Sequence, residues 1–116
     1  MSEALELEAN NDNGISTLVV KGYINSIGGE RIAEICDEHI EGGTHNFIFD
    51  LEGCRIVNSI GISILIEVIE KINELEGRVA FCCVSQTIAK TFRIMGLLQV
   101  STVYDTYDDA LQGMQG

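Results

Sequence analysis

Apolar and polar residues alternate along the first part of the chain in a way that predicts two strands. Residues 4–8 alternate apolar and acidic side chains, which is typical of a half-exposed strand with Glu6 and Glu8 in water. Turn-forming residues fill positions 10–14, and residues 15–21 follow as a second apolar strand. We therefore expect an antiparallel hairpin.

Two later segments show the period of amphipathic helices. Residues 26–41 carry their apolar side chains on one face and end at Gly42. Residues 59–75 carry isoleucine, leucine and valine around nearly the whole circumference of the first turns. Such an excess indicates either deep burial or an apolar surface that a partner covers.

Shorter segments complete the pattern. They are an apolar strand at 46–51, a connection at 52–55, a buried strand at 79–84, a helix from a Ser85 cap to Gly96, a strand at 98–103 and a closing helix at 106–112. The resulting order, β-β-α-β-α-β-α-β-α, predicts an α/β fold. Its mixed β-sheet should contain parallel crossovers and carry about four helices.

Composition narrows the class of protein. The 116 residues suffice for one domain with its own core. A formal net charge of −11, from 18 acidic and seven basic residues, opposes binding to nucleic acid or to an anionic membrane. Because no secretory signal and no membrane-spanning run is present, we expect a cytoplasmic protein. We also expect it to be a monomer.

Candidate catalytic groups are few. The two histidines lack metal-binding spacing, and the sequence contains no nucleotide-binding glycine loop and no hydrolase elbow. No C-x-x-C motif is present, and Cys82 and Cys83 should point to opposite faces of a strand. We therefore predict a protein that is not an enzyme, with reduced packing thiols, no metal and no cofactor.

The four residues Asn-Ser-Ile-Gly occur twice, at 25–28 and at 58–61. The first copy opens a charged helix and the second opens an apolar one, so a tandem duplication is rejected. Both copies close a strand and open a helix. Ser59 is an N-cap or first-turn residue; a plain cap is worth about 1 kcal/mol, whereas a phosphate at this place would leave the fold intact.

The order of elements and the stretch FIFDLEGCRIVNSIGISILIEVIEKI, at 47–72, resemble the STAS domain of bacterial anti-sigma factor antagonists. In that family an apolar strand ending in Asp-Leu leads to an Asp-Ser-Ser/Thr-Gly-Leu-Gly motif that opens a helix. VKGYIN at 20–25 and VAFCCVSQTIAKTFRIMGLLQV at 79–100 also fit. The resemblance covers about residues 5–111, which implies a single STAS domain over 1–116.

The resemblance implies a partner switch centred on Ser59. This residue falls on the serine that an anti-sigma factor serine kinase phosphorylates. The unphosphorylated domain would bind that kinase and free a sigma factor, and the phosphorylated domain would be released until a serine phosphatase resets it. The partner-binding residues implied are Asn25, Asn58, Ser59, Ile60, Gly61, Ser63 and Ile64.

The chain departs from the family motif at four positions. Asn58 replaces the leading Asp, Ile60 the second hydroxyl residue, Ser63 the second glycine, and Asn25 an acidic residue at the end of the earlier strand. Two alternatives stay open. One is a phosphorylation-independent STAS adaptor in which Ser59 is only a helix cap, and the other is a nucleotide-binding STAS domain.

Overall fold

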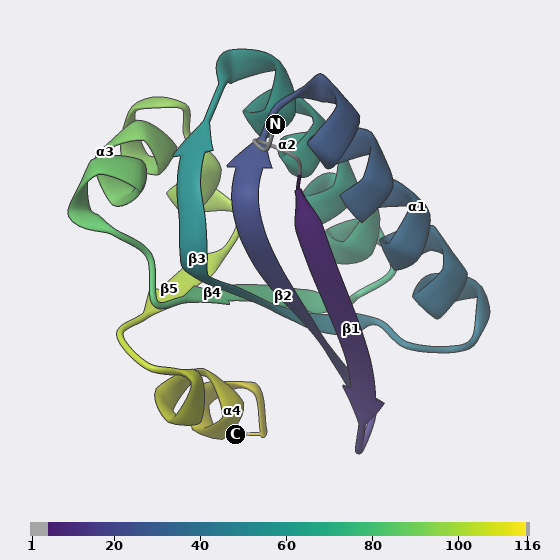
Figure 1. Ribbon diagram of the computed structural model, residues 1–116. Coiled ribbons are helices and arrows are strands. Elements are labelled where there is room, and N and C mark those ends of the chain that lie inside the picture. Colours follow the sequence, from purple (N-terminus) through teal and green to yellow (C-terminus); the bar gives the residue numbers. More distant parts are fainter. Residues whose placement is uncertain (1–4, 116) are drawn as a thin grey trace.

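A five-stranded mixed sheet forms the centre of the computed structural model, which describes residues 5–115 (Figure 1). The strands lie in the order β1-β2-β3-β4-β5, with β1 antiparallel to β2 and the other neighbours parallel. Their bounds are β1 Glu6–Asp12, β2 Ile15–Ile24, β3 Asn46–Val57, β4 Arg78–Cys82 and β5 Thr102–Tyr104. The predicted element order is confirmed.

Helices cover the two faces of the sheet unequally (Figure 1). Three pack on the face that carries Phe47, Phe49 and Phe81, whereas α4 packs on the other face against Ile48 and Ala80. The helices are α1 Ser26–Glu41, α2 Ser59–Glu74, α3 Gln86–Ile94 and α4 Tyr107–Gln115. Among the described residues, no helix is both long enough and apolar enough to cross a membrane.

The hairpin forms as predicted, but its turn is shorter than expected. The ladder between β1 and β2 continues to the pair Asp12 and Ile15, leaving only Asn13 and Gly14 in the turn. These two residues have φ values of 55° and 82°, which the tight turns between antiparallel strands require. Polar residues in the expected loop are therefore part of β1. Glu6 and Glu8 are exposed, as predicted.

The strands expected at 46–51 and 98–103 differ most from the structure. The strand beginning at residue 46 does not stop at 51, because β2 extends to Ile24 and offers β3 a pairing partner as far as Val57. The ladder accommodates this length through two register shifts. The expected strand at 98–103 instead begins as a 3-10 helix, Leu97–Gln99, which buries Leu97, and only residues 102–104 pair with β4.

Burial accounts for most of the apolar excess on α2. Its apolar residues face the sheet and α1 and are almost fully buried at Ile62, Leu65, Val68, Ile69 and Ile72. Ile60, in the first turn, is the exception, with 59% of its surface exposed. The side of the first turn that bears Ile60 therefore remains open to solvent.

Candidate functional site

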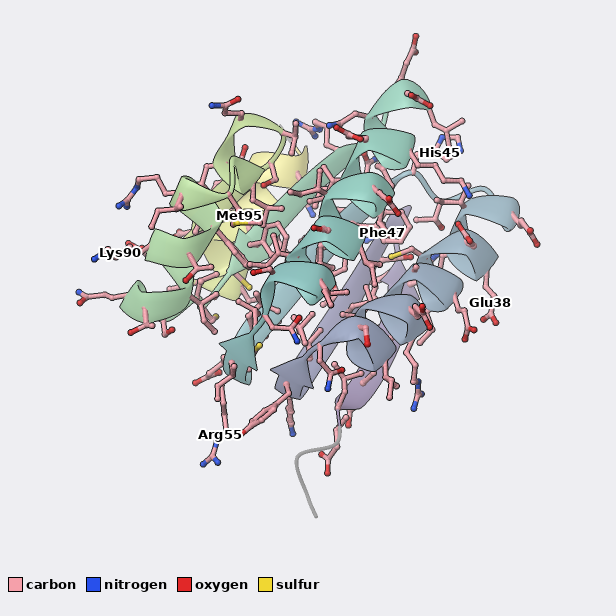
Figure 2. The ribbon with its side chains drawn as sticks, turned by 90° about the horizontal axis from the view of Figure 1, so that it is seen from above. Glu38, His45, Phe47, Arg55, Lys90 and Met95 are labelled. Carbon is pink, nitrogen blue, oxygen red and sulfur yellow. The ribbon has the colours of Figure 1, made fainter. Side chains whose placement is uncertain are left out.

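The two Asn-Ser-Ile-Gly copies lie next to one another in space. Residues Ile24 and Val57 are paired in the parallel ladder, so β2 and β3 end side by side. The backbone N–H of Asn58 donates to the carbonyl oxygen of Ile24 at 3.0 Å. The helices α1 and α2 both begin at this edge and run next to each other (Figure 2). This is the carboxyl edge of the parallel strands, where open α/β sheets place their binding sites.

Asparagine is the N-cap of both helices. The Oδ1 atom of Asn25 accepts the Gly28 N–H at 2.9 Å, and the Oδ1 atom of Asn58 accepts the Gly61 N–H at 2.8 Å. Ser59 is therefore the first residue of α2 and not its cap. Neither helix has an acidic residue in its first turn, so neither first turn itself contributes a negative charge to the positive end of the helix dipole.

Gly61 allows the start of α2 to approach the end of β2. A Cβ atom at this position would lie 2.4 Å from the carbonyl oxygen of Ile24, inside any allowed contact distance. Gly29 has a similar role in α1, where a Cβ atom would lie 3.2 Å from the Cβ atom of Ile64. Small residues thus set the spacing of the two helix starts.

The predicted site residues differ in their exposure. Ser59, Ile60, Ser63 and Asn58 are exposed, and the Ser63 hydroxyl donates to the carbonyl oxygen of Ser59 at 3.0 Å. Asn25 and Ile64 are half-buried and Gly61 is buried. Of the predicted residues, Ser59 and Ile60 are therefore accessible to a partner, whereas Gly61 is buried and packs against the end of β2.

Two exposed isoleucines at this edge were absent from the sequence prediction. Ile27 is 70% exposed and Ile56 is 48% exposed. With Ile60 they account for three of the five exposed large apolar side chains in the part of the chain that the structure describes. We call these three residues the isoleucine patch. The repeat itself carried a signal for Ile27, because Ile27 occupies the same place in the first copy as Ile60 in the second.

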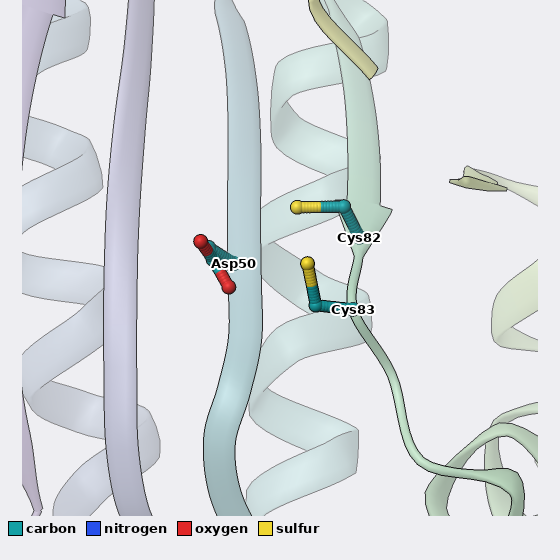
Figure 3. A group of neighbouring side chains, drawn as sticks. All are labelled: Asp50, Cys82 and Cys83. Atoms are coloured by element: carbon teal, nitrogen blue, oxygen red, sulfur yellow. The ribbon is translucent and has the colours of Figure 1, made fainter. Parts of the chain in front are cut away.

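The expectation that Cys82 and Cys83 face opposite sides of the sheet is wrong. Cys82 ends β4, two residues before the expected end of this strand at 84, and Cys83 has a φ of 62°, outside the strand conformation. Both thiols point toward β3 and lie near Asp50, on the face that α4 partly covers (Figure 3). Their sulfur atoms and a carboxylate oxygen of Asp50 all lie within 4.8 Å of one another.

All four cysteines are free thiols, as predicted. Burial, with a smaller contribution from Asp37, raises the pKa of Cys36 to about 12, and burial raises that of Cys54 to about 11. Burial also raises the pKa of Cys82 and of Cys83, and the negative charges of Asp50 and Glu52 add to the increase in pKa. All four side chains are therefore neutral thiols near pH 7.

Comparison with known proteins places the fold in a family. A sequence model of the STAS domain matches residues 6–110, and the chain belongs to the STAS domain family. It is 27% identical over 106 residues to the anti-sigma-F factor antagonist RsfB of Mycobacterium tuberculosis, covering 90% of this chain and 84% of RsfB.

Solved structures agree with the fold. An anti-sigma factor antagonist from Mycobacterium paratuberculosis superposes with a TM-score of 0.86 and 19% identity, over 100% of this chain and 98% of that one. The Bacillus cell fate determinant SpoIIAA in its phosphorylated form superposes with a TM-score of 0.71 and 20% identity, over 94% of this chain and 97% of that one.

Proposed function

We propose that this protein is an anti-sigma factor antagonist that acts by partner switching. In its unphosphorylated form it binds an anti-sigma factor serine kinase through the isoleucine patch and so releases a sigma factor. Phosphorylation of Ser59 by that kinase ends the interaction, and a serine phosphatase restores it. The similarity to RsfB, named as an anti-sigma-F factor antagonist, supports the role.

The observation that carries the proposal is the position of Ser59. It is exposed, it is the first residue of α2, and Asn58 has already taken the N-cap position. Its hydroxyl is therefore not needed to start the helix. Ile60 follows directly and is 59% exposed, so a kinase that binds the apolar surface would meet the hydroxyl at the same time.

The fold would tolerate a phosphate on Ser59. The phosphate would carry about −1.5 to −2 charges at neutral pH, and the first turn of α2 holds no acidic residue that would repel it. A negative charge near a helix N-terminus is stabilising by roughly 0.3–1 kcal/mol. The amides Asn25 and Asn58, which replace the acidic residues of the related motif, add no repulsion.

A bound partner would not tolerate the same phosphate. The isoleucine patch would be buried in the complex, and a phosphate on Ser59, directly before Ile60, would lose part of its hydration there. The charge therefore weakens the complex while the domain stays folded. A reversible switch requires a modification that weakens the complex without unfolding the domain.

The alternative of a constitutive adaptor assigns Ser59 only a capping role. The hydrogen bond from the Gly61 N–H to Asn58 leaves no such role for Ser59. If the adaptor reading were correct, Ser59→Ala and Ser59→Asp would bind the partner equally well. We favour the switch because the serine is exposed and has no part in the N-cap.

The test is intact mass spectrometry after incubation with ATP and the anti-sigma factor kinase of the same organism. We expect one added phosphate on the wild-type protein, none on Ser59→Ala, and one on Ser26→Ala. Ser26 is the matched control because it is the first residue of α1 and follows the same kind of asparagine cap. Phosphate retained by Ser59→Ala, or absent from the wild type, would refute the proposal.

A further inference from the structure

The side chains of Asp50, Cys82 and Cys83 form a second cluster, separate from the isoleucine patch. Asp50 comes from β3, and the two cysteines come from the end of β4 and the residue after it (Figure 3). They lie on the opposite face of the sheet from the large core, within the region that packs around α4. The mechanism proposed for Ser59 uses none of them.

The backbone brings these groups together by an unusual conformation. In a regular strand, neighbouring side chains point to opposite faces. Cys83 instead has a φ of 62°, which is uncommon for a residue other than glycine. That conformation turns its thiol to the same side as the Cys82 thiol, and both sulfur atoms point toward β3 (Figure 3). Uncommon backbone conformations of this kind are concentrated at functional sites.

We propose that Asp50, Cys82 and Cys83 bind a thiophilic divalent cation of the zinc class. Two thiolates and a carboxylate are a donor set that such cations accept, with water in the fourth position. The three donor atoms lie within 4.8 Å of one another. Ligand atoms of a tetrahedral zinc ion are separated by roughly 3.5–4 Å. Small side-chain rotations would therefore bring the three donor atoms to the separation that the metal requires.

The charges around the cluster favour a cation. Burial is the main cause of the raised pKa of both thiols, and the negative charges of Asp50 and Glu52 add to the increase. A bound cation reverses this effect, because it stabilises the thiolates that the carboxylates destabilise. Binding therefore releases the two thiol protons to solvent and leaves two thiolates and one carboxylate around the metal.

The approach to the site is open on one side. Cys82 is buried, whereas Asp50 and Cys83 are half-buried and offer a path from solvent. The Oδ1 atom of Asp50 also accepts the Glu52 N–H at 3.1 Å, which orients the carboxylate without using its second oxygen. Metal ligands in proteins are commonly held by such outer hydrogen bonds.

Cobalt(II) is the probe that tests this site, because thiolate coordination gives it characteristic charge-transfer and visible absorption bands. The full chain, reduced and metal-free, would be titrated with Co²⁺ and then with Zn²⁺. We expect one Co²⁺ per chain, with bands that Zn²⁺ removes. Asp50→Asn should weaken binding at least tenfold, and Cys83→Ser should remove most of the charge-transfer intensity.

Cys54→Ser is the matched control, since Cys54 is buried in the large core, apart from the cluster. It should leave the bands unchanged. Because Cys82 is buried, the half-exposed Cys83 is the preferred target, and circular dichroism would verify that each variant is folded. Zn²⁺ should also raise the thermal midpoint of the wild type and not that of Cys83→Ser. Absence of the bands from the wild type, or their persistence in Cys83→Ser, would overturn the proposal.

Discussion

The two Asn-Ser-Ile-Gly copies have the same local structure and different surroundings. In each, the asparagine accepts the N–H of the glycine three residues later, the serine is the first helical residue and the isoleucine is exposed. Ser59, however, is exposed whereas Ser26 is half-buried. The same four residues therefore begin a helix in both places, but only the second serine is exposed.

The packing beneath the two copies also differs. Under Gly61 lies the backbone oxygen of Ile24, 2.4 Å from where a Cβ atom would be. Under Gly28 the nearest atoms would be the Tyr23 oxygen at 2.9 Å and the Leu5 side chain at 3.0 Å. The second copy is thus held more tightly against the end of β2. Under the proposed function, this close packing would keep the start of α2 in place when Ser59 is phosphorylated.

The largest expected effect on stability comes from adding a methyl group to the second copy. Gly61→Ala should destabilise the protein by about 2–3 kcal/mol, because the new carbon overlaps backbone that cannot rotate away. Gly28→Ala should cost less, about 1 kcal/mol, because the Tyr23 oxygen at 2.9 Å needs to move by only a small amount, the Leu5 side chain can shift, and alanine offsets part of the cost by favouring the helix by roughly 1 kcal/mol. Urea unfolding monitored by circular dichroism measures both. Equal losses would show that the two copies are packed alike.

Loss of either cap should have a smaller effect, equal in the two copies. Asn58→Ala and Asn25→Ala each remove one side-chain hydrogen bond to a first-turn N–H, and each should cost about 1 kcal/mol. The double variant should cost the sum if the caps act independently. Asn58→Asp is the control that keeps the acceptor and should retain stability. Chemical denaturation of the five proteins, wild type included, would expose any inequality between the caps.

The smallest expected effect on stability belongs to the isoleucine patch. Ile27→Ser and Ile60→Ser remove side chains that are mostly in water, so each should change the free energy of unfolding by less than about 0.5 kcal/mol. Affinity for the anti-sigma factor kinase should respond more strongly, with Ile60→Ser losing more than about 1 kcal/mol. Ile94→Ser is the control, because Ile94 is 73% exposed and lies on α3, outside the patch. A similar loss of affinity with Ile94→Ser would show that binding does not depend specifically on the isoleucine patch.

Local signals explain which parts of the fold were predictable from the sequence. The helix at 26–41 has the predicted bounds because an asparagine cap begins it and Gly42 ends it. The length of β3 was not predictable, since it depends on how far β2 continues beside it. The same holds for Cys83, whose positive φ has no marker in the apolar run that contains it.

The candidate site was predictable only in part. Ser59 and Ile60 follow from the resemblance to the STAS motif, and Gly61 follows from the same motif. The exposure of Ile27 and Ile56 depends on packing between β2, β3 and α1, which no pattern within a single segment expresses. The repeat indicates where the two helices begin. That the two starts are adjacent follows from the pairing of Ile24 with Val57 in the parallel ladder.

The most direct test of the switch is the affinity of the anti-sigma factor kinase for charge variants, measured by isothermal titration calorimetry. Ser59→Asp should bind at least tenfold more weakly than Ser59→Ala, a difference of about 1.4 kcal/mol. Gln99→Glu adds one negative charge at an exposed position of the 3-10 helix that precedes β5 and should bind like the wild type. Affinities of Ser59→Asp and Ser59→Ala within twofold of each other would contradict the account.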